Sequence, residues 1–263
     1  MTADAVKVEG LVARYGDRTI LDGIDLTVRR GEVRVILGGS GGGKTTLLKH
    51  CIGLLTPAAG RVLVLDQPLS ELEGAARVAL LRRIGVLFQA GALLGSITVG
   101  ENVALPLREH TDLPEAVILE MVRLKLAAVE LVHAEHLLPS ELSGGMRKRA
   151  ALARALALDP DVLFCDEPSA GLDPLTSAGL DELLLRLRDL FGMAMVVVTH
   201  ELLSIARIAE RATMLAGGKV VADGTLDEVR GTDHPDVRAF FARSAGGGMR
   251  GPPSALDVLR GAG

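Results

Sequence analysis

The stretch Gly38-Gly39-Ser40-Gly41-Gly42-Gly43-Lys44-Thr45-Thr46 decides the fold, because it fits the phosphate-binding pattern G-x-x-x-x-G-K-[ST]. Glycine suits such a loop, since a residue without Cβ lets the backbone wrap closely around phosphate. The backbone N–H groups then form an anion-binding nest at the start of a helix. The pattern predicts that Lys44 reaches the β- and γ-phosphates and that the Thr45 hydroxyl binds Mg²⁺.

The residues on either side of the loop support this interpretation. Glu32–Leu37 reads EVRVIL, which predicts a strand before the loop, and Thr45–Ile52 predicts a helix after it. A flexible glycine-rich linker would have neither the preceding strand nor the Lys-Thr pair. The stretch therefore predicts a phosphate site between a strand and a helix.

The composition indicates a globular protein with an aliphatic core. Of the 263 residues, 48% are hydrophobic and 24% are charged, which is ample for a core. Only 2% are aromatic, with no Trp and a single Tyr, so aliphatic side chains must fill the interior. The formal net charge of −4 argues against a nucleic-acid surface, because such surfaces depend on Lys and Arg. We therefore expect no nucleic-acid partner.

The two cysteines and the hydropathy pattern indicate in which cellular compartment the protein is expected. Cys51 and Cys165 lie in apolar segments without C-x-x-C or metal-ligand spacing, which favours buried free thiols in a reducing cytosol. The amino end lacks a basic region followed by an apolar core, so we expect no signal peptide. No uncharged apolar run approaches the ~18–20 residues of a membrane span. The expectation is a protein that is soluble or held to a membrane by a partner.

Strands and helices alternate along most of the chain, which predicts a parallel sheet with helices on its faces. Residues 90–140 are predicted to form a helical insert between sheet segments. The expected strands are Val6–Tyr15, Thr19–Arg29, Arg61–Leu65, Ile84–Gln89, Asp161–Cys165, Met193–Thr199, Ala212–Ala216 and Lys219–Ala222. Two of the expected helices begin at Ser70 and at Thr225. The others span Val99–Arg108 (interrupted at Pro106), Pro114–Val132, Arg147–Leu158, Leu175–Phe191 and His234–Arg243.

Two carboxylates end the strand Val162–Cys165 and complete the predicted phosphate site. Asp166 is expected to hold Mg²⁺ through its water shell. Glu167 follows at the carboxyl end of the sheet, where ligands gather in open α/β folds, and is predicted to be the general base for the attacking water. The alternative is a pair of acidic residues that merely end a strand before a proline turn.

Ser143-Gly144-Gly145 at a predicted helix start is a second candidate phosphate-binding N-terminus. One nucleotide cannot easily use two such sites of one chain if they lie far apart on the surface. A head-to-tail C₂ dimer with each nucleotide sandwiched between two protomers would resolve this.

Tyr15, just before the Gly16-Asp17 turn, has two interpretations. It either covers the edge of a sheet or forms a platform on which an adenine ring stacks. The second is favoured by the resemblance that follows.

The chain resembles the ATPase subunit of ABC transporters across residues 5–230. The matching motifs are the phosphate loop at 38–46, Gln89 as the Q-loop, Leu142–Met146 as the signature, Val162–Glu167 as the metal-binding strand, Ser169-Ala170-Gly171-Leu172-Asp173 as the D-loop and His200 as the switch histidine.

The resemblance implies ATP and Mg²⁺ as cofactors and assigns further roles. Gln89 senses Mg²⁺ and the transmembrane partner, while His200 contacts the γ-phosphate and joins Glu167 and Gln89 as a catalytic group. Ser143 and Gly145 meet the ATP of the other protomer in a homodimer. Asp173 is implied to couple the two sites.

The implied fold is α/β, a P-loop NTPase core with a parallel sheet, an antiparallel β subdomain and an α-helical subdomain. Residues 1–232 would form the nucleotide-binding domain, with the helical subdomain at about 90–157. Residues 233–263 would be a C-terminal extension that contacts the dimer partner or is disordered.

A narrower resemblance is to Mla/Mce-type lipid transporter ATPases. It is carried by Leu87–Leu94, Asn102–Thr111 and Met146, which replaces the Gln common in ABC signatures. It implies ATP-driven phospholipid movement between inner and outer membranes, at the cytoplasmic face of the inner membrane. Permease subunits would be contacted through Gln89–Thr111, and an MCE-type substrate-binding subunit indirectly. The alternatives are another ABC importer or exporter, a soluble ABC ATPase and a non-hydrolysing nucleotide-binding regulator.

Overall fold

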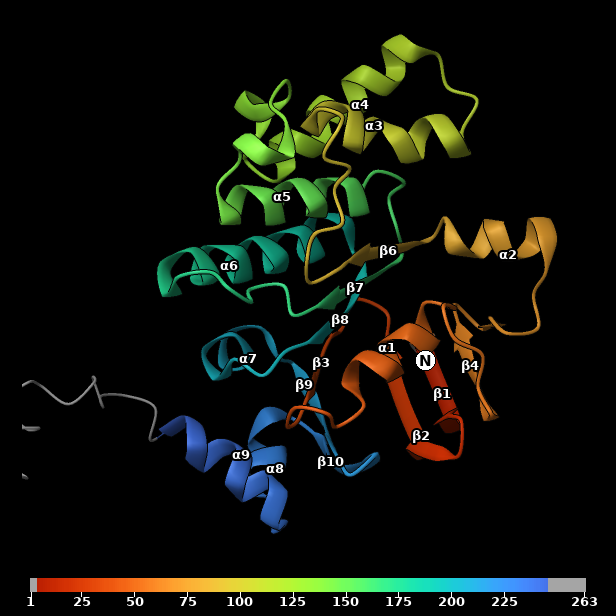
Figure 1. Cartoon of the computed structure of the whole chain (residues 1–263), viewed down its shortest axis with the longest axis vertical. Helices are drawn as coiled ribbons and strands as arrows, with labels where there is room; N and C mark the ends of the chain where they lie inside the picture. Colours follow the sequence, from red (N-terminus) through yellow and green to blue (C-terminus); the bar gives the residue numbers. More distant parts are fainter. Residues whose placement is uncertain (1–3, 246–263) are drawn as a thin grey trace, which may run out of the picture.

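The computed structural model describes residues 4–245, and two sheets form its centre (Figure 1). The strands are β1 Asp4–Tyr15, β2 Arg18–Arg29, β3 Val33–Leu37, β4 Ala59–Val64, β5 Gln67–Pro68, β6 Ile84–Leu87, β7 Val162–Asp166, β8 Ala194–Val198, β9 Arg211–Ala216 and β10 Lys219–Gly224. The helices are α1 Lys44–Cys51, α2 Gly74–Leu81, α3 Val99–His110, α4 Glu115–Ala128, α5 Gly144–Ala155, α6 Pro174–Phe191, α7 Leu202–Ile208, α8 Leu226–Gly231 and α9 Pro235–Ala245.

The larger sheet has six strands in the order β10-β9-β3-β8-β7-β6. The strands from β9 to β6 are parallel to one another, and β10 closes the edge as an antiparallel hairpin with β9. The smaller sheet is antiparallel, in the order β2-β1-β4-β5. Both the parallel core and the antiparallel subdomain expected from the sequence are therefore confirmed.

The hydrophobic core divides along the two faces of the six-stranded sheet. Successive side chains of a strand point to opposite faces of the sheet, so each buried strand contributes side chains to two hydrophobic clusters, one on each face. In β7, Leu163 and Cys165 join the cluster that contains helices α3 to α7, whereas Val162 and Phe164 join the cluster with α1 and the antiparallel sheet. The interior of both clusters is aliphatic, as the composition predicts, with Phe164 the largest fully buried side chain of the described residues.

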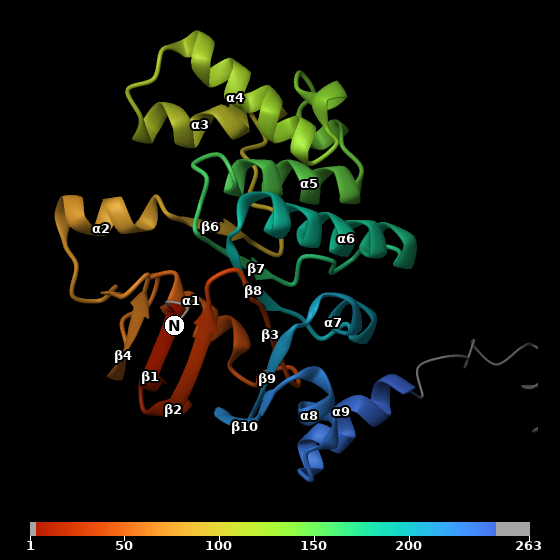
Figure 2. The same cartoon turned by 180° about the vertical axis from the view of Figure 1, so that it is seen from behind.

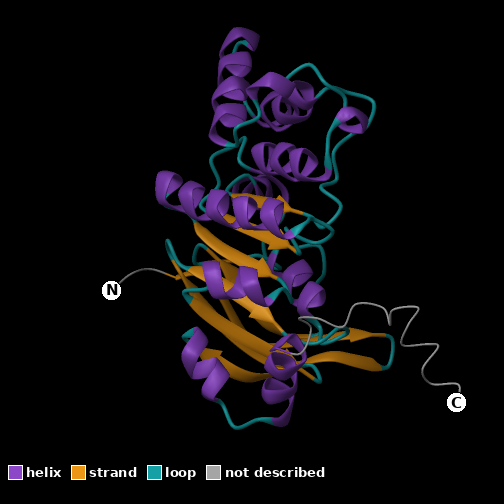
Figure 3. Cartoon of the chain, turned by 90° about the vertical axis from the view of Figure 1, so that its left-hand side faces the viewer, coloured by secondary structure: helices purple, strands orange, loops and turns teal. Residues whose placement is uncertain are grey.

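Helices α3, α4 and α5 gather at one end of the molecule (Figure 1), where Figure 3 shows helices and loops, and the strands share the rest with the remaining helices. Thr98 and Glu101 form a capping box that fixes the start of α3. The Asn102 side chain is fully buried and bonds both the N–H and the carbonyl of Leu94, which ties the loop before the helix to the helix itself. The helical insert lies between β6 and β7 in the chain, as expected.

Two details of the predicted helices α2 and α3 were wrong. Helix α2 begins at Gly74 rather than at Ser70, because Leu69 is still hydrogen-bonded to Val62 of β4. Pro106 does not interrupt α3, which continues to His110. Pro106 has no N–H to donate within the helix, and the buried side chains of Val103 and Leu107 hold the helix in place.

The helix predicted to run from Pro114 to Val132 ends earlier. Pro114 is the N-cap rather than the first helical residue, and α4 stops at Ala128. Glu130 then takes a left-handed backbone with φ +60°, and the N–H of Leu131 bonds the carbonyl of Leu126. This geometry satisfies the last carbonyls of a helix and turns the chain away.

The C-terminal part of the described chain packs against the core. Thr225 and Glu228 form the predicted capping box of α8. In α9, Val237 is fully buried. The predicted turn at 254–260 lies outside the described residues. Among residues 4–245, we find no helix long and apolar enough to cross a membrane.

Candidate functional site

The glycine-rich loop connects β3 to α1, and its shape requires glycine at two positions. Gly38 has φ +145°, and a Cβ there would lie 2.2 Å from the carbonyl oxygen of Leu215 in β9. Gly43 has φ +95°, and a Cβ there would lie 2.5 Å from Cδ2 of Leu21. The backbone of β9 therefore excludes a side chain at Gly38, whereas at Gly43 the left-handed backbone conformation, together with the contact to Leu21, favours glycine.

The Lys44 side chain folds back over the loop that precedes it. Its ammonium donates to the carbonyls of Gly38 at 2.9 Å and Gly39 at 3.0 Å. Burial lowers the pKa of Lys44, against the nearby charges of Glu167 and Asp166, which raise it. The ammonium is thus held on the axis of the loop with carboxylates near it, where an anion would complete its coordination.

Thr45 and Asp166 meet across the junction between α1 and β7. The Thr45 hydroxyl donates to Asp166 Oδ1 at 3.4 Å. Burial raises the pKa of the Asp166 carboxyl, and so does the charge of Glu167, whereas the Thr45 hydroxyl, Lys49 and Lys44 lower it. A buried carboxylate beside a hydroxyl is a donor set that suits Mg²⁺, which prefers oxygen ligands and takes few from the protein when phosphates supply the rest.

Glu167 and His200 are brought together because β7 and β8 are neighbouring parallel strands. The register pairs Asp166 with Val198, so the residues just beyond both strands face each other. His200 Nδ1 lies 2.8 Å from Glu167 Oε1, and the Glu167 N–H donates to the Val198 carbonyl at 2.8 Å. Glu167 has φ +47°, an uncommon conformation for a residue with a side chain.

The second carboxylate oxygen of Glu167 makes no hydrogen bond. Oε2 is buried, and the Glu167 side chain is only 13% exposed. A buried charged oxygen without a partner is costly, so such atoms mark places where a ligand or water completes the site. Glu167 therefore has the environment expected of a group that acts on a bound molecule.

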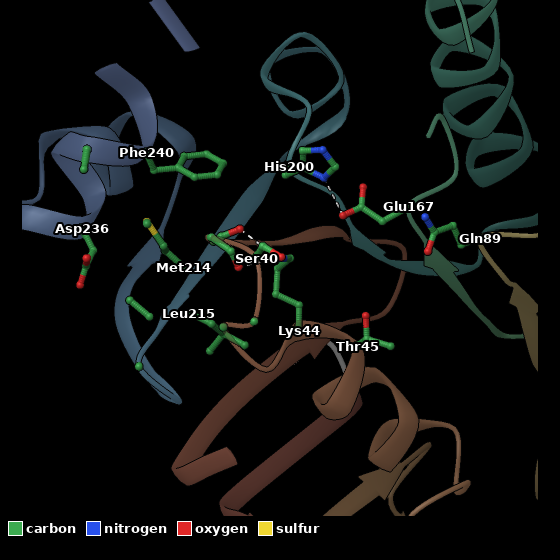
Figure 4. A pocket seen from close by; sticks show the side chains of 17 residues that line it. Ser40, Lys44, Thr45, Gln89, Glu167, His200, Met214, Leu215, Asp236 and Phe240 are labelled. Atoms are coloured by element: carbon green, nitrogen blue, oxygen red, sulfur yellow. Dashed lines mark hydrogen bonds and ion pairs between the residues drawn. The ribbon is translucent and has the colours of Figure 1, made fainter. Parts of the chain in front are cut away.

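These groups surround one cavity of about 700 Å³ (Figure 4). Its size lies in the range of small-molecule sites. Ser40, Lys44 and Thr45 line it from the glycine-rich loop, with Gln89, Glu167 and His200 on the opposite side. The loop residues Gly38, Gly39, Gly41 and Gly42 complete that wall. Gly43 and Thr46 line a smaller adjoining cavity together with Ile20.

Other predicted site residues lie away from this cavity. Tyr15 is 51% exposed at the end of β1 and does not line it. Ser143, Gly144 and Gly145 do not line it either, although the structure does place them at a helix start. Ser143 caps α5 by accepting from the Met146 N–H at 3.2 Å. The two candidate phosphate sites of the chain are therefore separate.

Asp173, which the resemblance predicts to couple two sites, has a defined local role. Its carboxylate caps α6 by accepting from the N–H groups of Leu175 and Thr176, both at 3.1 Å. Thr176 in turn packs on Gly145, where a Cβ would lie 2.6 Å from Thr176 Cγ2. The start of α5 and the start of α6 therefore fit together only because residue 145 is glycine.

Sequence reasoning missed three sets of residues at the site. Met214, Leu215 and Ala216 of β9 and Gly217 of the turn after it line the cavity. Asp236, Ala239 and Phe240 of α9 line the cavity as well. Figure 4 shows Asp236 and Phe240 across the cavity from Glu167 and Gln89. The i, i+3, i+4 spacing of the three α9 residues on a predicted helix could have indicated a shared face. Lys148 of α5 was also missed, and its ammonium donates to the backbone carbonyls of Gln89 and Glu167. No local signal identifies such a contact.

Comparisons with known proteins identify the family of the chain. The family model described as ABC transporter matches residues 21–170. The chain is similar to the intermembrane phospholipid transport system ATP-binding protein MlaF of Haemophilus influenzae, with 40% identity over 99% of this chain and 98% of the relative. It is 42% identical to MlaF of Escherichia coli K12, over 93% of this chain and 91% of the relative.

A solved structure of an ATP-binding cassette has the same fold. A dimeric ATP-binding cassette in a post-hydrolysis state, with ADP and Pi bound, superposes with a TM-score of 0.76 and 31% identity. The match covers 84% of this chain and 98% of that one.

Proposed function

The chain belongs to the ABC transporter family of ATP-binding proteins, and on that premise we propose that it hydrolyses ATP to power phospholipid transport between two membranes. The observation that carries the hydrolytic part is the Glu167 carboxylate. It lines the same cavity as the phosphate loop, with one oxygen on His200 and the other buried without a partner.

The roles proposed for the loop follow from charge and geometry. The N–H groups at the start of α1 and the Lys44 ammonium bind the β- and γ-phosphates. Thr45 and Asp166 would hold Mg²⁺, with Gln89 close by on the cavity wall, and the ion would neutralise phosphate charge as it does in P-loop enzymes.

Glu167 is proposed to orient and deprotonate the attacking water. Its free Oε2 is the acceptor for that proton, and its bond to His200 fixes the plane of the carboxylate. His200 is 62% exposed on the cavity side, which leaves its other ring nitrogen able to reach a terminal phosphate. The strained backbone of Glu167 keeps the carboxylate at this place before substrate arrives.

A head-to-tail homodimer would complete each site. Ser143 and Gly145 present a capped helix start that serves no nucleotide within their own chain, since neither lines the cavity. Placed over the partner's glycine-rich loop, this helix start would bind the terminal phosphate from the other side. Asp173, next to the start of α5, would couple the two ATP sites of the dimer. Tyr15 is proposed to stack on the adenine ring at the rim of the cavity.

A membrane permease is the proposed partner of the helical part. Two adjoining cavities, of about 340 and 280 Å³, share Arg82 and Leu158 between α2, β6, α3 and α5. Pro106 and His110 line the groove from the segment 89–111, and Figures 1 and 2 show α2 and α3 on the same side of β6. Exposed Val78 of α2 adds an apolar contact at its rim.

The phospholipid cargo rests on similarity to the MlaF proteins. The inner-membrane location and the indirect link to an MCE-type subunit rest on the same resemblance. A specific alternative is an ABC ATPase that serves another importer or exporter, because the ATP site is common to both.

Two experiments test the two parts separately. The purified chain should hydrolyse ATP and bind it with Mg²⁺, and absence of both would contradict the enzymatic part. Purification from its native membrane, followed by identification of attached proteins and lipids, should recover a permease with bound phospholipid. Recovery of an amino-acid permease, or of no membrane protein, would contradict the cargo.

A further inference from the structure

Helix α5 carries a buried cation, Lys148, that is hydrogen-bonded to the backbone of two other segments. Lys148 lies one turn beyond the Ser143 cap and is only 7% exposed. Its ammonium donates to the Gln89 carbonyl at 2.6 Å and to the Glu167 carbonyl at 3.3 Å. Burial of an ammonium is costly unless hydrogen bonds and charge compensate it, so these bonds must offset a substantial penalty.

Both carbonyls belong to residues whose side chains line the ATP cavity. Gln89 lies two residues after the end of β6, and Glu167 directly follows β7. One ammonium therefore joins the backbone at two walls of the site. The Glu167 carbonyl also accepts from the Ala170 N–H at 3.2 Å, while its N–H is bonded to Val198. The Glu167 backbone is thus fixed on both sides.

A second cation of α5, Arg154, holds the segment that follows Gln89 against the same helix. Arg154 donates to the carbonyls of Gly91 at 3.1 Å and Ala92 at 2.7 Å. The segment 89–92 is therefore hydrogen-bonded to α5 through three backbone carbonyls. Glu167, in contrast, is joined to α5 by Lys148 alone among the hydrogen bonds described. Lys148 is the group that connects Glu167 to this helix.

We propose that Lys148 is a positioning residue that holds the Glu167 and Gln89 backbones in register, so that turnover depends on it while ATP affinity does not. The inference rests on the proposed roles of Glu167 and Gln89. It adds a mechanical link to them: the α5 start, proposed to bind the partner's ATP, and the catalytic carboxylate of its own site move as one unit. When the start of α5 docks on the nucleotide bound by the partner, the Lys148 link would bring Glu167 of the same chain into position for the nucleotide in its own cavity.

The test replaces Lys148 in the full-length protein and measures ATP turnover and affinity separately. Lys148→Met keeps most of the side-chain length but removes the charge and all donors. We expect kcat to fall about 10–100-fold with little change in KM, because misplacement of a catalytic group by about 1 Å costs that much. Lys148→Arg restores both the charge and the donors and should recover most of the loss.

Lys125 provides a matched control. It is 6% exposed, its ammonium is paired with Asp159 and lies over the Phe191 ring, and none of these residues lines the ATP cavity. Lys125→Met should lower the thermal midpoint with kcat unchanged. Equal kcat losses in both Met variants, or no loss in Lys148→Met, would overturn the proposal.

Hydrogen exchange separates this inference from the proposed function. In Lys148→Met, amides of residues 88–92 and 166–170 should exchange faster than in the wild type, and Lys125→Met should leave both segments unchanged. This readout needs no catalysis, so a wild type without ATPase activity would contradict the function and leave the link testable. Unchanged exchange in both segments would refute the link even in an active enzyme.

Discussion

Replacement of Glu167 by glutamine isolates the charge of the proposed base from its shape. The amide oxygen can still accept from His200, which lies 2.8 Å from Oε1. A positioned general base contributes about 10²- to 10⁴-fold, so we expect kcat to fall by that factor. At ~1.4 kcal/mol for each tenfold, the barrier rises by about 3–5.5 kcal/mol. ATP affinity should persist, because the glycine-rich loop and Lys44 are unchanged.

The same substitution should not destabilise the fold. Glu167 Oε2 is buried without a hydrogen bond, and the Glu167 charge raises the pKa of Asp166 beside it. With the amide oxygen on His200, the amide NH2 takes the place of Oε2 and is buried without a partner in its turn. The substitution therefore removes a buried charge and its repulsion of Asp166 but not the unsatisfied polar atom, and the favourable interaction with Lys44 is lost. These effects oppose one another, so we expect the thermal midpoint to change by less than about 2–4 °C, the shift that ~1 kcal/mol produces.

The assays are steady-state ATP hydrolysis, binding of ATP by equilibrium titration, and thermal unfolding without nucleotide. Glu120→Gln on the exposed face of α4 controls for the loss of one carboxylate. Hydrolysis at the wild-type rate in Glu167→Gln would refute the general-base assignment. A midpoint several degrees below that of the wild type would refute the claim that Oε2 is an uncompensated charge.

Three further predictions concern the loop, the α5–α6 contact and the thiols. Lys44→Ala should weaken ATP binding at least tenfold, measured by titration, because a charge-assisted contact to phosphate is lost; unchanged affinity would contradict the phosphate assignment. Gly145→Ala should cost ~1–3 kcal/mol in denaturant unfolding, since its Cβ would lie 2.6 Å from Thr176 Cγ2, and Thr176→Ser should restore most of that loss. Cys51 and Cys165 should resist a thiol reagent at pH 8 until the protein unfolds, because burial raises the pKa of each to about 12; rapid labelling of the native protein would show that they are accessible.

Local patterns predicted most of the elements because they depend on neighbours in the chain. The loop at 38–46 lies between a strand and a helix as predicted, and the Thr225 capping box starts α8. The prediction at Ser70 was wrong for a non-local reason. Leu69 pairs with Val62 of β4, and this sheet contact competes with the helix start that Ser70 would favour alone.

The sequence by itself determined the loop, the carboxylates that follow β7 and the division into sheet and helical parts. Glycine, lysine and strand-ending acidic residues have local requirements that a pattern records. Only the tertiary structure decided that Glu167 meets His200 and that Lys148 joins Glu167 to Gln89. Those contacts depend on β7 lying between β6 and β8, and on α5 packing across their ends. Strand order is fixed by packing of the whole core, so residues distant in the chain become neighbours without any local signal.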